Sequence, residues 1–154
     1  MAKIPAHIQL SDAEIDAFLQ DESRCRIATI SAKGEINLTP MTFGWANGCI
    51  YIFGRGQKIA DLRRNPTATV LIDTGDSWPT LKGLMMRGQA VVLEDANAEA
   101  QDPGLADARL NVGQKSGLVK DDEPQPYAAT ASGRSRRWIV FKPDSKVSWY
   151  NERL

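Results

Sequence analysis

Long apolar runs are missing from this sequence. No stretch approaches the roughly 20 apolar residues that a membrane-spanning helix needs. The start, MAKIPAHIQL, lacks the apolar core of a secretory signal. We therefore expect a cytoplasmic protein that does not enter a membrane.

Histidine and cysteine are also scarce, and the chain has no net charge. The single histidine, His7, lies in a segment expected to be flexible, which argues against a Ser-His triad or a histidine-rich metal site. Cys25 and Cys49 form no C-x-x-C pair, so we expect two buried reduced thiols. The 19 basic and 19 acidic side chains cancel, so no overall field attracts nucleic acid. We expect no metal site, and no catalytic residue can be named.

The composition is that of a globular protein. With 154 residues, 42% hydrophobic and 25% charged, the chain suits one domain over residues 1–154. Ser11 followed by Glu14 is a capping box, which predicts a helix from about 11 to 20. Residues 96–133 begin with alanine-rich helical stretches broken by Pro103-Gly104, and we expect a mobile insertion there.

Most of the remaining chain predicts strands. Apolar and β-branched runs interrupted by Lys33-Gly34 and Asn47-Gly48 indicate strands near 25–31, 36–45 and 49–53, joined as hairpins. TATVLID and GLMMRGQAVVLED predict two more strands, with Gly83 and Gly88 as possible bend or bulge points, and RRWIVFKP and SKVSWYNE predict two around a Pro143-Asp144 turn. The fold class is therefore mainly β: a six- to seven-stranded antiparallel barrel with short helices.

The stretch YIFGRGQKIADLRRNP places Gly54, Gly56, Arg55 and Lys58 where a strand gives way to a helix. It matches neither the P-loop nor the dinucleotide fingerprint, because Ile59 stands where each motif needs another residue. Cations at a helix start are mildly unfavourable, by roughly 0.3 to 1 kcal/mol, and a bound phosphate would remove the conflict. Solvated surface cations explain the pattern equally well.

Together with its neighbours, this turn resembles the pyridoxamine 5′-phosphate oxidase-like family of flavin-binding split barrels. The resemblance rests on RIATIS, INLTPMTFGW, IYIFGRGQKIADLRRNPTATVLID and GLMMRGQAVVLED, and it resumes in RRWIVFKPDSKVSWYNERL. It implies a homodimeric split barrel with FMN in clefts at the subunit interface. This family also includes reductases that use the deazaflavin F420.

The resemblance also implies which residues bind the cofactor. Lys58 matches the phosphate-binding lysine, Arg55 lies in the same turn, and Gln57 stands where many members have arginine. Other residues match segments near the flavin: Pro40, Met41 and Thr42 along the ring, Phe53 at a strand end, Arg87 in MMRGQA, and Trp149 near the partner's flavin. Strand propensity, core packing, an exposed charge or dimer packing would explain these last residues as well.

Three functions remain open at this point. The first is an FMN-dependent oxidoreductase that exchanges hydride with a nicotinamide donor or a small organic substrate. The second is an F420-dependent reductase, for which the cations at 134–137 would meet the acidic tail, although a solvated face also explains them. The third is a non-catalytic protein that binds or stores a flavin, haem or tetrapyrrole. Full pyridoxamine phosphate oxidase activity is not expected, because VSWYNERL ends the chain without the family's substrate-binding histidine segment.

Overall fold

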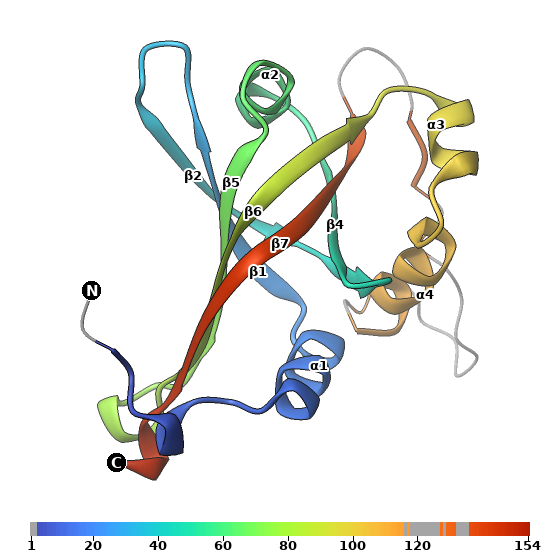
Figure 1. The fold of residues 1–154 in the computed structure, drawn as a ribbon. Helices are drawn as coiled ribbons and strands as arrows, with labels where there is room; N and C mark the ends of the chain where they lie inside the picture. The colour runs from blue at the N-terminus through green and yellow to red at the C-terminus, as the bar shows by residue number, and fades with distance from the viewer. Residues whose placement is uncertain (1–2, 116, 118–126, 128, 132–135) are drawn as a thin grey trace.

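The strands form one continuous antiparallel sheet. The computed structural model describes residues 3–115, 117, 127, 129–131 and 136–154. Within these residues seven strands pair in the order β2-β1-β5-β6-β7-β4-β3, and the sheet curls until β2 contacts β4. This curled half-barrel confirms the predicted mainly β fold (Figure 1). The strands are β1 (Arg24–Ile30), β2 (Ile36–Thr42), β3 (Gly44–Ala46), β4 (Cys49–Gly54), β5 (Thr67–Thr74), β6 (Lys82–Leu93) and β7 (Arg137–Tyr150).

Short helices surround the sheet. α1, α3 and α4 lie on one side of it, and α2 lies across one end (Figure 1). The predicted capping box is present at the start of α1, because the Ser11 hydroxyl accepts from the backbone N–H of Glu14 and the Glu14 carboxylate accepts from the N–H of Ser11. None of the described helices is long and apolar enough to cross a bilayer. The helices are η1 (Ala6–Ile8), α1 (Asp12–Asp21), α2 (Gln57–Arg64), η2 (Trp78–Thr80), α3 (Ala96–Gln101), α4 (Leu105–Lys115) and η3 (Asn151–Arg153).

The strand predicted over residues 36–45 is in fact two strands. Phe43 separates β2 from β3, and its backbone N–H donates to the carbonyl of Ser23. Before this residue the chain pairs with β1, and after it the chain pairs with β4. The change of partner lets one stretch of chain reach both ends of the sheet and so helps to curl it. The Phe43 side chain is fully buried.

The two strands predicted around Pro143-Asp144 are in fact one. β7 runs without interruption and pairs with β6 along its length. Arg87 lies opposite Ser145 and Gly88 lies opposite Pro143, so Asp144 is the extra residue of a bulge. The bulge accommodates the proline without ending the strand. Of the two predicted bend or bulge points, Gly88 is confirmed, although the extra residue is in β7, whereas Gly83 pairs with Trp149 without a shift of register.

The start of the predicted insertion is a pair of helices. α3 and α4 occupy residues 96–115, and the rest of the segment to 133 lies mostly outside the described residues. α4 packs very closely on β3, because a Cβ on Gly44 would lie 2.6 Å from the carbonyl oxygen of Ala108. The Asn111 carboxamide accepts from the backbone N–H of Trp45. The inserted helices are therefore fastened to the barrel at its β3 edge.

Candidate functional site

The turn between β4 and α2 leaves the start of the helix without a side-chain cap. Gly56 precedes the helix with φ of 83° and ψ of −148°, which favours glycine, and no side chain caps the helix start. The first backbone N–H groups of a helix lack intrahelical partners, and the helix dipole is positive there. No acidic residue lies in the first turn of α2 to balance it.

Two cations crowd this turn. The Lys58 ammonium donates a 2.8 Å hydrogen bond to the carbonyl of Arg55. Partial burial lowers the pKa of Lys58, and the charge of Arg55 lowers it further. Among the described residues, no carboxylate forms an ion pair with either side chain. The turn therefore holds positive charge that no carboxylate among the described residues neutralises by an ion pair.

Gln57 lies in the same turn, but its side chain is already engaged. Its amide nitrogen donates to the Asp61 carboxylate at 2.8 Å, one helical turn further on. The carboxamide is thus held toward its own helix. Arg55 and Lys58 are the cations that the turn and the first turn of the helix supply.

A cavity lies beside this turn, in the split between the edges of the sheet. Its volume is about 320 Å³. Its lining includes four of the residues that the sequence singled out: Pro40, Met41 and Thr42 from β2 and Phe53 from β4. The structure therefore brings these four residues together.

Gly54 joins the cavity to the cationic turn. A Cβ at this position would lie 3.3 Å from the Cε of Met41 and 3.3 Å from the Cδ of Lys58. Met41 lines the cavity and Lys58 belongs to the turn, so the two parts of the site meet over a single glycine. A ligand with an apolar ring and an anionic tail can occupy both parts only if they adjoin in this way.

Three cavity residues were missed by the sequence analysis: Val112, Tyr127 and Trp138. Trp138 lies opposite Phe53 in the β4·β7 ladder, and their ring centroids are 5.2 Å apart. Tyr127 meets both rings edge-on, at 6.3 Å from Phe53 and 6.2 Å from Trp138. The Trp138 indole N–H donates to the carbonyl of Ala129. One wall of the cavity is therefore a packed aromatic cluster.

Val112 reaches the cavity because α4 is held firmly in place. Lys115, in the last turn of this helix, donates to the carbonyl of Leu19 and lies 3.7 Å above the centre of the Phe43 ring. Burial lowers the pKa of Lys115 to about 7. Together with the Asn111 contacts, this lysine ties α4 to α1 and β3. The inserted helix thus forms a fixed wall of the cavity.

Arg87 and Trp149 do not line this cavity. Arg87 is exposed in the middle of β6, between Thr69 and Ser145 on the neighbouring strands. Trp149 packs over Gly83, where a Cβ would come within 2.1 Å of its ring. It lies eleven residues along β7 from Trp138, and at about 3.3 Å per residue an extended strand places the two far apart.

The predicted arginine cluster is only partly visible. Arg134 lies outside the described residues, and Arg136 is exposed at the start of the last strand. The Arg137 guanidinium lies 4.0 Å from the Glu94 carboxylate, which also pairs with Arg63. No group of three or more potential metal ligands occurs in the part of the chain that the structure describes.

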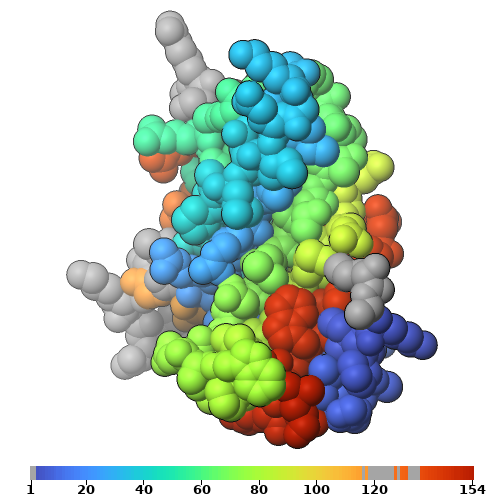
Figure 2. Space-filling model, turned by 90° about the vertical axis from the view of Figure 1, so that its left-hand side faces the viewer, coloured from blue at the N-terminus to red at the C-terminus, as the bar shows by residue number. Residues whose placement is uncertain are grey.

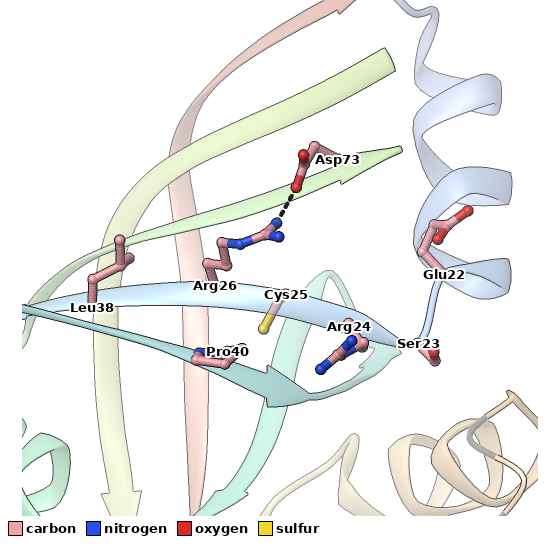
Figure 3. Close-up of a pocket in the computed structure, with 8 residues that line it drawn as sticks. All are labelled: Glu22, Ser23, Arg24, Cys25, Arg26, Leu38, Pro40 and Asp73. Atoms are coloured by element: carbon pink, nitrogen blue, oxygen red, sulfur yellow. Dashed lines mark hydrogen bonds and ion pairs between the residues drawn. The ribbon is translucent and has the colours of Figure 1, made fainter. Parts of the chain in front are cut away.

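A second hollow, of about 480 Å³, lies on the outer face of the sheet (Figure 3). Arg24 and Arg26 of β1 line it together with Glu22 and Asp73, and Arg26 pairs with Asp73. Two cations and two carboxylates balance, so the hollow does not select an anion. Pro40 lines both this hollow and the cavity in the split.

Comparisons with known proteins identify solved structures with a similar fold. A conserved hypothetical protein from Mycobacterium tuberculosis is 25% identical, with a TM-score of 0.77 over 99% of this chain and 92% of that one. A haem storage protein from Vibrio cholerae is 15% identical, with a TM-score of 0.66 over 92% and 97% of the two chains.

An FAD-binding protein from Mesorhizobium loti is 17% identical, with a TM-score of 0.64 over 91% of this chain and 94% of that one. No curated protein sequence matches the chain. The model of the pyridoxamine 5′-phosphate oxidase family matches residues 11–144, which is most of the sequence. The chain therefore belongs to the pyridoxamine 5′-phosphate oxidase family.

Proposed function

We propose that this protein is an FMN-binding oxidoreductase that transfers hydride between the flavin and a nicotinamide donor or a small organic substrate. The observation that carries the proposal is the junction at Gly54, where the Met41 side of the aromatic cavity meets the Lys58 side of the cationic turn. Its fold relatives include a protein that binds FAD. A bound flavin would supply the hydride-transfer chemistry.

The described residues fit the two ends of FMN. The phosphate would accept from backbone N–H groups at the start of α2 and pair with Lys58 and Arg55, which relieves the repulsion between these cations. Phe53, Tyr127 and Trp138 line the cavity, and aromatic walls of this kind favour a flat, mostly apolar ligand. The isoalloxazine ring of FMN is such a group. The chain would orient the ring and exclude water, and the Thr42 hydroxyl is a polar group on the cavity wall.

Titration with three cofactors tests this function. Purified protein stripped of ligands should bind FMN at one molecule per chain, show the visible absorbance bands of bound flavin, and oxidise a nicotinamide donor. F420 and haem, titrated separately by calorimetry, serve as comparisons. Preference for F420 would favour the deazaflavin alternative, and tight binding of any of the three without turnover would favour a storage protein. Failure to bind FMN would contradict the proposal.

We also propose that the protein is a homodimer built on the outer face of β1, β2 and β5. Ile36 and Leu38 are 74% and 63% exposed on β2, which is an edge strand. Exposed apolar residues on one strand face favour a protein contact. Figure 2 looks toward this side, where the blue and cyan atoms of β1 and β2 lie beside the green atoms of β5. The charge-balanced hollow at Arg24 and Arg26 lies on the same face.

Leu38→Glu should convert the dimer into a monomer. A carboxylate there loses its hydration, and because Glu22 and Asp73 already balance Arg24 and Arg26 in the adjoining hollow, the added charge is left in excess at the contact. Sedimentation velocity on the wild type and the variant measures the change. Ala106→Glu adds the same charge at an exposed position on α4 and should leave the dimer intact. A monomeric wild type, or a variant that remains dimeric, would contradict this interface.

A further inference from the structure

A buried carboxylate lies beneath the cationic turn and belongs to neither the cavity nor the turn. The Asp61 side chain, in the middle of α2, has 0% exposure. It is the only charged residue among those of the described chain that are buried. Burying a carboxylate is costly unless hydrogen bonds satisfy it, so its position calls for a reason.

The first reason is that Asp61 forms hydrogen bonds with the β1–β2 hairpin. One Asp61 oxygen accepts from the Thr29 hydroxyl at 2.8 Å and from the Asn37 amide at 2.7 Å. Thr29 and Asn37 lie opposite each other in the β1·β2 ladder. A single carboxylate oxygen therefore holds both strands of the hairpin to α2.

The second reason is that Asp61 forms hydrogen bonds with two side chains of its own helix. The other oxygen accepts from the Gln57 amide at 2.8 Å and from the Arg64 guanidinium at 3.2 Å. Arg64 also donates to the carbonyl of Ile30, at the end of β1. Burial alone would raise the pKa of Asp61, but the four hydrogen bonds outweigh it and hold the pKa at about 2. The group is therefore a fixed anion with four fixed donors.

These contacts connect the two halves of the proposed site. Gln57 and Lys58 open the helix that follows the cationic turn, and Asn37 precedes Pro40, Met41 and Thr42 on the strand that lines the cavity. We infer that Asp61 is a positioning residue for the phosphate site: it fixes the start of α2, and hence Lys58, relative to β2. This inference rests on the proposed flavin function.

Only a carboxylate satisfies all four donors. Asparagine has the same shape, but its NH₂ group replaces one acceptor oxygen and would face a donor, either from Thr29 and Asn37 or from Gln57 and Arg64. Asp61→Asn should therefore release one side of the network while keeping the volume of the buried group. The start of α2 would then lose its fixed relation to the hairpin.

The test compares FMN with riboflavin, which lacks the phosphate. In wild type we expect FMN to bind about tenfold or more tightly than riboflavin, as a charge-assisted phosphate contact implies. In Asp61→Asn this preference should fall by at least about fivefold, while riboflavin affinity changes by less than about twofold. Calorimetry measures both affinities. Circular dichroism confirms that the variant is folded.

Two further variants keep the test decisive. Arg63→Gln removes an exposed charge from the same helix without touching Asp61, and it should leave the FMN preference unchanged. Asn37→Ala removes only the contact between β2 and Asp61, at a half-buried position, and it should also reduce the preference for FMN. This variant provides the test if Asp61→Asn does not fold. An unchanged preference in the folded Asp61 variant, or in Asn37→Ala, overturns the inference. A wild type without any preference for FMN overturns the proposed phosphate site instead.

Discussion

Lys58→Met should weaken FMN binding by about 1 to 3 kcal/mol, or about 5- to 150-fold in Kd, as expected for the loss of a charge-assisted hydrogen bond. Methionine keeps the apolar stem that packs near Gly54 and removes only the ammonium. The same change removes both the repulsion between Lys58 and Arg55 and the hydrogen bond from Lys58 to the Arg55 carbonyl, and because these effects oppose each other, we expect little change in the stability of the fold. Calorimetric titration of the folded variant with FMN measures the effect.

The control for this substitution is Lys142→Met. Lys142 is an exposed lysine on β7, opposite Gln89 and outside the cavity and the turn. Its replacement should leave the FMN affinity within about twofold of wild type. Unchanged FMN affinity in Lys58→Met would refute the assignment of this lysine. An equal loss for riboflavin would show that the effect does not come from the phosphate.

Trp138→Ala should lower the free energy of unfolding by about 3 to 5 kcal/mol, the usual cost of truncating a large buried aromatic residue. Trp138 is only 1% exposed, packs against Phe53 and Tyr127, and donates to the carbonyl of Ala129. Its removal would enlarge the cavity and leave that carbonyl without its donor. Urea denaturation followed by circular dichroism measures the change.

Trp78→Ala is the matched control for the aromatic cluster. Trp78 is 66% exposed in η2, so its truncation should change the free energy of unfolding by less than about 0.5 kcal/mol. The hydrogen bond from Asn151 goes to the backbone carbonyl of Trp78 and survives the substitution. Equal losses for the two tryptophans would show that burial in the aromatic cluster does not determine the stability.

Local signals predicted most elements of this fold. The Ser11 capping box and the Asn47-Gly48 turn depend on residues a few positions apart, and both are present. The predictions failed at Phe43 and at Pro143, where the outcome depends on distant strands. Phe43 marks a change of partner from β1 to β4, and the bulge after Pro143 depends on continuous pairing with β6. The first error leaves out one strand and the second adds one, so the predicted number of strands is still correct.

In the candidate site, too, residues in continuous segments were predicted, and residues brought in by distant strands were missed. Lys58, Met41 and Phe53 belong to continuous segments whose family resemblance could be recognised without a structure. Trp138 becomes a neighbour of Phe53 only through the β4·β7 register, and Tyr127 lies in the insertion. Asp61 was not singled out by the sequence analysis, and its partners Thr29 and Asn37 come from two other elements, β1 and β2. Sequence patterns do not carry contacts of this kind.

The position of Trp138 gives the protein a built-in optical probe. Trp138 lines the cavity, and none of the other three tryptophans, Trp45, Trp78 and Trp149, does. Flavins absorb light at the wavelengths where tryptophan emits, and energy transfer falls steeply with distance. Occupancy of the cavity would therefore quench the emission of Trp138 most strongly, so the unlabelled protein can report ligand entry and exit in real time.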